Sequence, residues 1–192
     1  MVFCVQRFKT VPGAEKPLPR GKATARKEIF MRNSTLCYIE KDGCYLMMHR
    51  VKKEKDINKD KWIGVGGGFL DDESPEDCVR REALEETGLV LKDPKLLSVV
   101  TFVCEGAETE QMFLFKSFDF EGTLSDCDEG VLEWVPKTEL YGLDLWAGDR
   151  IFLRRIENGC DFFTLKLVYD SRGNLLEAVL NGTDNVIKEA EV

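Results

Sequence analysis

Three glutamates that lie close together in the sequence, Glu82, Glu85 and Glu86, have the residue type and the spacing of a site for a divalent cation. A serine followed by Pro75 and two acids is typical of a helix start, and Gly88 of a helix end, so we expect a helix between them. On such a helix the three carboxylates share an arc about 100° wide. Three negative charges at that spacing repel one another, and a hard cation with oxygen ligands, such as Mg2+, removes the repulsion. The pattern therefore predicts a magnesium site on one face of this helix.

The segment before the helix, residues 64–68, contains four glycines. Glycine has no side chain, so the backbone at Gly66 and Gly67 can approach a phosphate group or a metal ion closely. An acidic helix by itself is usually a solvated surface, and a glycine cluster alone is a weak signal. Because the two features are adjacent in the chain, they favour one site for a metal ion and a phosphate group.

The same stretch resembles the Nudix box of the Nudix hydrolases, a pattern of glycine, glutamate and arginine residues at fixed spacing. The positions that match are Gly67, Glu73, Arg81, Glu82, Glu85, Glu86 and Gly88, followed by Leu89. The resemblance extends over about residues 33–180 and implies an α/β fold, specifically an α/β/α sandwich with a mixed β-sheet. It also implies metal-assisted hydrolysis of a diphosphate linkage.

The resemblance implies a role for each matching residue. The three helix glutamates would hold Mg2+, or Mn2+ in its place, together with the carbonyl oxygen of Gly67. Gly66 and Gly67 would lie against the substrate. Arg81 would orient a glutamate of the box, and Glu73 and Gly88 would support the helix geometry.

Glu129, in an acidic loop before an expected strand, is a candidate outside the box. It lies five residues before Trp134, where similar nucleotide-hydrolysing enzymes carry a carboxylate near the metal cluster. By that resemblance Glu129 would bind the metal or take a proton from the attacking water, and would join Arg81 and the helix glutamates as a catalytic residue. Loop acids are usually solvated, and that alternative stays open.

Trp146 and Asp149 form a second candidate site. In similar enzymes that remove oxidised purine nucleotides, the MutT-like or 8-oxo-dGTP diphosphatase group, a tryptophan stacks on the base and an aspartate reads the purine edge. The indole offers a flat apolar face, and a carboxylate accepts hydrogen bonds from ring nitrogen or amine donors. Gly148 and Ile63 depart from that group, in which an aspartate and an asparagine can occur at these places. The alternative is a core tryptophan and a helix-capping aspartate.

Together these residues predict a Mg2+-dependent nucleoside triphosphate pyrophosphohydrolase. Its expected substrates are oxidised purine nucleotides such as 8-oxo-dGTP, and its expected products are the monophosphate and pyrophosphate. One alternative is hydrolysis of another nucleoside diphosphate compound, such as ADP-ribose or a dinucleotide polyphosphate. Another is a non-catalytic Nudix module that senses a nucleotide. Such a module would be expected to lack box carboxylates, and all of them are present here.

The composition limits which partners the protein is expected to bind and in which cellular compartment it is expected. The length of 192 residues fits one domain, and a net charge of −8 argues against a nucleic acid held on a broad basic surface. The seven cysteines show no C-x-x-C spacing and are expected to be mostly buried free thiols in a reducing cytosol. No apolar run is long enough to span a bilayer, and no signal peptide is expected. We therefore expect a cytoplasmic enzyme with a small nucleotide substrate and neither a nucleic acid nor a membrane as partner.

The chain divides by charge and pattern. Residues 1–30 hold seven Lys and Arg, two acids and three prolines, and are expected to form a flexible basic extension. Residues 31–182 are expected to form the Nudix domain and residues 183–192 a C-terminal tail. Strands are predicted at residues 34–39, 44–51, 95–103, 111–118, 131–135, 162–169 and 174–180, and a second helix at 146–156. The first helix should pack against the sheet through Val79, Ala83, Leu84 and Thr87.

Overall fold

The computed structural model of the chain describes residues 31–54 and 56–191. The basic extension expected at residues 1–30 lies outside the described residues. The strands are β1 (Met31–Lys41), β2 (Cys44–His49), β3 (Trp62–Ile63), β4 (Leu89–Leu91), β5 (Lys95–Cys104), β6 (Thr109–Ser117), β7 (Phe120–Gly122), β8 (Val131–Pro136), β9 (Phe163–Tyr169), β10 (Leu175–Leu180) and β11 (Asp184–Asn185). The α-helices are α1 (Pro75–Thr87) and α2 (Ala147–Glu157), and the 3-10 helices are η1 (Leu140–Gly142) and η2 (Ile187–Ala190).

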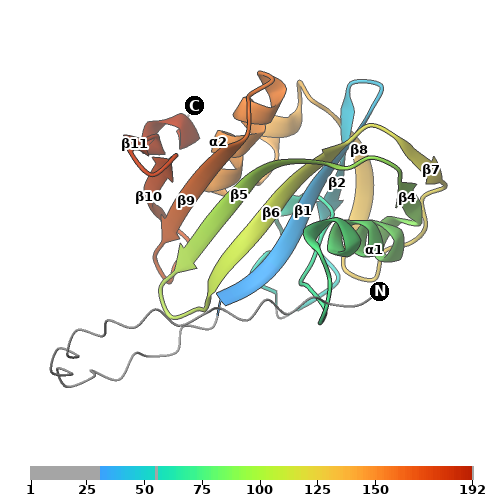
Figure 1. Ribbon diagram of the computed structural model, residues 1–192, viewed down its shortest axis with the longest axis horizontal. Helices are drawn as coiled ribbons and strands as arrows, with labels where there is room; N and C mark the ends of the chain where they lie inside the picture. The colour runs from blue at the N-terminus through green and yellow to red at the C-terminus, as the bar shows by residue number, and fades with distance from the viewer. Residues whose placement is uncertain (1–30, 55, 192) are drawn as a thin grey trace, which may run out of the picture.

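Across the described part of the chain, nine strands form one mixed sheet in the order β11-β10-β9-β5-β6-β1-β2-β3, with β8 paired to β2 (Figure 1). The pairs β1–β6 and β5–β9 are parallel, and the other pairs are antiparallel. Strands β4 and β7 form a small antiparallel sheet of their own.

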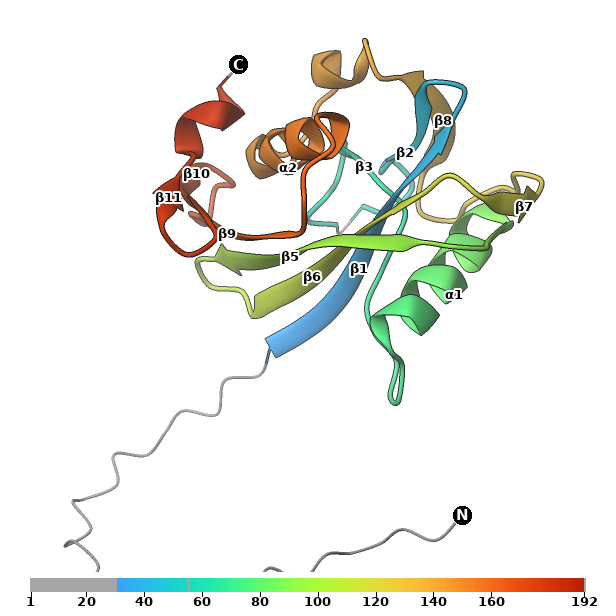
Figure 2. The same ribbon diagram turned by 45° about the horizontal axis from the view of Figure 1, so that its top comes forward.

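The helices α1 and α2 cover opposite faces of the large sheet (Figure 2). Successive side chains of a strand point to opposite faces, so β1 contributes to two cores. Leu36 and Tyr38 pack in the core under α2, whereas Cys37 and Ile39 pack in the core under α1. The architecture is an α/β/α sandwich with a mixed sheet, which confirms the expected fold class.

Helix α1 begins and ends where the sequence predicts. Ser74 Oγ accepts the backbone N–H of Asp77 at 3.1 Å, and the Asp77 carboxylate accepts the N–H of Ser74, which completes a capping box. At the other end, Gly88 has φ +76° and donates its N–H to the carbonyl of Leu84 at 2.9 Å. These local contacts fix the start of the helix that carries the box glutamates.

The expected buried face of α1 needs one correction. Val79, Ala83 and Thr87 are buried as predicted, but Leu84 is 50% exposed. Leu84 is one residue beyond Ala83 and therefore points about 100° away from it, outside the arc that meets the sheet. The buried surface includes Glu86 instead.

Every strand and helix predicted from the sequence is present, with ends that shift by at most three residues. The short strands β3, β4, β7 and β11 had no counterpart among the predictions. Residues 183–192 include β11 and η2, and Val186 between them is buried in the core under α2.

The six cysteines of the described residues are free. Cys37, Cys78 and Cys127 are buried, but the expectation of buried thiols is wrong for the other three, which are half-buried. Within the described chain, no helix has both the length and the apolar character that crossing a membrane requires.

Candidate active site

The glycine segment, residues 64–68, lies between β1 and α1. Thr35 donates its backbone N–H to the carbonyl of Gly67 at 2.9 Å. A Cβ at Gly66 would collide with the backbone carbonyl of Thr35. A Cβ at Gly67 would lie 2.5 Å from the carboxylate of Glu82. Position 66 therefore requires glycine, whereas a side chain at position 67 would have to displace the Glu82 carboxylate.

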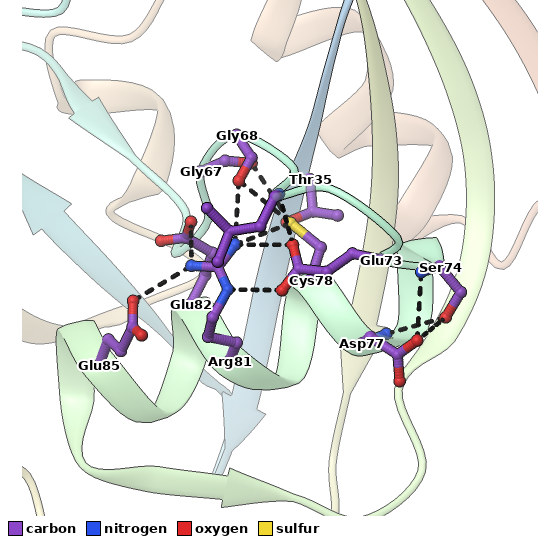
Figure 3. A network of polar contacts seen from close by, with 11 residues as sticks. Thr35, Gly67, Gly68, Glu73, Ser74, Asp77, Cys78, Arg81, Glu82 and Glu85 are labelled. Atoms are coloured by element: carbon purple, nitrogen blue, oxygen red, sulfur yellow. Dashed lines mark hydrogen bonds and ion pairs between the residues drawn. The ribbon is translucent and has the colours of Figure 1, made fainter.

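Arg81 is at the centre of the polar network in Figure 3. Its Nε donates to Glu73 at 2.6 Å, and its Nη2 donates to the carbonyl oxygen of Gly68 at 3.0 Å. Its Nη1 donates to Glu82 at 2.7 Å and to Glu85 at 3.1 Å. The bond to Glu73 is the main cause of the raised pKa of Arg81, and Arg81 in turn lowers the pKa of Glu73 to about 2. Arg81 thus lies where it can orient box glutamates, the role that the resemblance implies.

Glu86 is a buried carboxyl group in the same region. Its Oε2 accepts the backbone N–H of Gly66 at 2.9 Å. Burial is the main cause that raises the pKa of Glu86 to about 8, and the negative charges of Glu129 and Glu82 contribute to the same rise. A divalent cation would offset that repulsion and hold the carboxylate charged. Carboxylates beside a backbone carbonyl are the hard oxygen donors that fit Mg2+.

Glu85 is placed differently from Glu82 and Glu86. Its side chain is 59% exposed and paired with Arg81, whereas Glu82 and Glu86 line a common cavity. Arg81 also holds Glu82. As the side chains lie, no three acidic, cysteine or histidine residues within 31–54 and 56–191 form a group that could hold a metal ion. A cation shared by all three glutamates would have to displace Arg81 from two of them.

The cavity lined by the glycine segment and α1 has a volume of about 340 Å³. Glu82 and Glu86 line it from α1, and Glu129 lines it from the loop before β8. Arg50 and Lys53 also line it, and both form ion pairs with Glu129. Burial acts to raise the pKa of Glu129, but the two cations outweigh it and the pKa is lowered. The fold therefore brings Glu129 to the box glutamates in ionised form.

A second cavity, of about 130 Å³, adjoins the first. Both are lined by Leu36, Ile57, Asn58, Ile63, Glu110 and Met112. Trp146 and Asp149, the predicted base-binding residues, line the second cavity alone. Most of its lining is apolar, whereas the first cavity is rich in charge. A molecule with a flat apolar part and a charged part therefore suits the pair.

Trp146 and Asp149 stand at the start of α2. The Trp146 indole is edge-on to the Tyr169 ring, with 5.5 Å between centroids, and its Nε1 donates to Asn58 Oδ1 at 2.8 Å. Asp149 is buried, and burial raises its pKa to about 7, against the opposing charge of Lys61. The N-cap of α2 is Trp146 and has no side-chain capping bond, so Asp149 is not the helix cap that the alternative required.

Arg50, Lys53 and Asn58 line the cavities but were not singled out from the sequence. They belong to a charged stretch, residues 50–61, in which neither spacing nor residue type distinguishes them from their neighbours. Only their contacts with distant residues, such as Glu129, reveal them.

The NUDIX domain family matches residues 31–156 of this chain. The chain belongs to the Nudix hydrolase family. Members of this family act on phosphorus-containing anhydrides, and residues 67–89, which include the end of the glycine segment and all of α1, carry the sequence pattern of the Nudix box.

Two relatives and one solved structure show how similar this Nudix domain is to known proteins. The uncharacterized Nudix hydrolase YvcI of Bacillus subtilis (strain 168) is 27% identical over 125 residues, which cover 62% of this chain and 75% of YvcI. The oxidized purine nucleoside triphosphate hydrolase of Danio rerio is 31% identical over 99 residues, which cover 50% of this chain and 63% of the relative. The crystal structure of the MutT protein from Bacillus halodurans superposes with a TM-score of 0.70 and 26% identity, and covers 80% of this chain and 99% of that protein.

Proposed function

We propose that this Nudix domain hydrolyses nucleoside triphosphates with Mg2+, that it prefers oxidised purine nucleotides of the 8-oxo-dGTP type, and that it releases the monophosphate and pyrophosphate. The observation that carries the proposal is the pair of adjoining cavities. One presents box carboxylates, and the other presents Trp146 and Asp149. The similarity to the oxidized purine nucleoside triphosphate hydrolase of Danio rerio supports the choice of substrate.

The charged cavity would receive the phosphates. Glu82, Glu85 and Glu86, with the carbonyl of Gly67, would hold Mg2+, and Mn2+ is the alternative ion. When bound, the ion neutralises charge on the phosphate oxygens. A box glutamate or Glu129 takes a proton from the attacking water. Positioning and electrostatics account for most of the rate in such reactions, because phosphoryl transfer needs little covalent help.

The apolar cavity would receive the base. The indole of Trp146 supplies a flat face for stacking, and its edge is fixed by Asn58 and by the Tyr169 ring. Asp149 supplies oxygens for donors on the purine edge. The base would then be held at one end of a substrate whose phosphates reach the box.

The first test is phosphate release, with pyrophosphatase added, from 8-oxo-dGTP, dGTP, ADP-ribose and Ap4A, with and without Mg2+. We expect Mg2+-dependent turnover with a preference for 8-oxo-dGTP. If phosphatase in place of pyrophosphatase reveals turnover of ADP-ribose or Ap4A instead, the box assignment stands and the base-recognition proposal fails. If no compound is turned over, the result favours the alternative of a nucleotide-sensing module.

A further inference from the structure

We propose that Asn58 reads the purine base, by donating a hydrogen bond from its side-chain amide nitrogen to the carbonyl oxygen at position 6. The inference rests on the proposed function and names a specificity-determining residue for it. Asn58 lies outside the Nudix box, in the loop between β2 and β3, and lines both cavities.

The orientation of the Asn58 amide follows from its partner. The indole Nε1 of Trp146 can only donate, so the 2.8 Å contact identifies the Asn58 atom as the oxygen. The amide nitrogen, with its two donors, is therefore the atom left for other partners. Among the described residues it has none. A ligand stacked on Trp146 would therefore lie beside the Asn58 amide nitrogen, a hydrogen-bond donor whose orientation is already fixed.

The loop holds Asn58 in place from its backbone side as well. Its N–H donates to Asp56 Oδ1 at 2.9 Å, and its carbonyl accepts the N–H of Lys61 at 2.9 Å. The Asp56 carboxylate, 8% exposed, also binds Arg50 at 2.7 Å. A donor fixed before binding loses little conformational freedom when a ligand arrives, and such preorganisation strengthens recognition.

Asn58 and Asp149 together favour a particular base edge. Asn58 offers a donor, and Asp149 offers acceptor oxygens, in the same cavity. The complementary edge carries an acceptor next to a donor. In an oxidised guanine the oxygen at position 6 is flanked by N–H groups on both sides. An adenine-type base has an amino group at that position, which would face Asn58 donor to donor and leave a buried donor unpaired.

The experiment compares kcat/KM for 8-oxo-dGTP and 8-oxo-dATP in the wild type and in Asn58→Asp. The substitution keeps an oxygen for Trp146 and the side-chain size, but replaces the donor with a second acceptor. We expect the kcat/KM for 8-oxo-dGTP, divided by the kcat/KM for 8-oxo-dATP, to be about 10- to 100-fold lower in the variant than in the wild type. Both substrates carry the same triphosphate, so the effect of the added charge on phosphate binding should cancel in the ratio.

Asn181→Asp is the matched control. Asn181 also uses Oδ1 to accept a backbone N–H, from Thr164 at 3.0 Å, and it lines neither cavity. An unchanged ratio in Asn58→Asp, with an active wild type and an unaltered melting temperature, overturns the role of Asn58 and leaves the proposed function intact. Failure of the wild type to hydrolyse either substrate overturns the proposed function and this inference with it.

Discussion

At the scale of single residues, charge compensation explains the arrangement of the box. Arg81 contacts Glu73, Glu82 and Glu85, so one guanidinium offsets three carboxylates that would otherwise repel one another. Glu86 has no such partner within hydrogen-bond distance among the described residues, and its pKa is raised to about 8. The box therefore contains carboxylates in two different electrostatic settings before any cation binds.

The Glu85→Gln variant tests the predicted metal set. Replacing a charged ligand by a neutral amide should lower Mg2+-dependent turnover by about 100-fold or more. The side chain is largely exposed, so the melting temperature should stay the same. Glu76→Gln, on the same helix but not at one of the matching positions of the box, is the control and should keep full activity. Near-normal turnover in Glu85→Gln would refute the metal assignment.

Asp149 should make stability depend on pH. Its folded-state pKa of about 7 lies above the ordinary value of 3.8, so between these two pH values the folded chain binds a proton that the unfolded chain has lost. The contribution of Asp149 to the free energy of unfolding therefore falls as the pH rises from 3.8 to about 7. Asp149→Asn removes the effect and should melt about 10 °C higher than wild type at pH 8, with no such gain at pH 4. An equal difference in melting temperature between Asp149→Asn and the wild type at both pH values would contradict the raised pKa of Asp149.

At the scale of elements, the cap of α1 should contribute measurably to stability. Ser74→Ala removes the side-chain acceptor for the Asp77 N–H and should cost about 1 kcal/mol. For a domain of this size the melting temperature should drop by about 2–4 °C. Ser171→Ala, in an exposed turn, is the control and should leave the melting curve unchanged.

A helix or strand is easier to predict from the sequence when the contacts that define it are made by residues close together in the chain. The ends of α1 were predicted correctly because Ser74 and Gly88 act within a few residues of themselves. Strands β3, β4 and β7, of two or three residues, were missed because their pairing partners are distant in the chain. For the same reason the box residues could be named from their spacing, whereas Asn58 could not. Its position depends on Trp146, which lies 88 residues further along the chain.

At the scale of the whole molecule, residues 31–192 should be sufficient for the fold and the chemistry. Both helical layers, the sheet and both cavities are built from residues 31–191, and the NUDIX match begins at residue 31. A chain that starts at Met31 should keep the circular dichroism spectrum, the melting temperature and kcat/KM of the full protein. A loss of nucleotide hydrolysis on truncation would show that residues 1–30 contribute to the site.

The parallel pairing of β1 with β6 has a consequence for the order of assembly during synthesis. Met31 lies opposite Thr109, so one edge of β1 stays open on the ribosome until β6 has emerged. The hairpin β1–β2, the glycine segment and α1 are consecutive in the chain and can associate on the other edge of β1 in the meantime. The second cavity, which Trp146 and Asp149 line, needs β6, α2 and β9, and so forms only when nearly all of the chain has been translated. The nascent chain can thus bring the glycine segment against α1 before α2 delivers Trp146 and Asp149 to the second cavity.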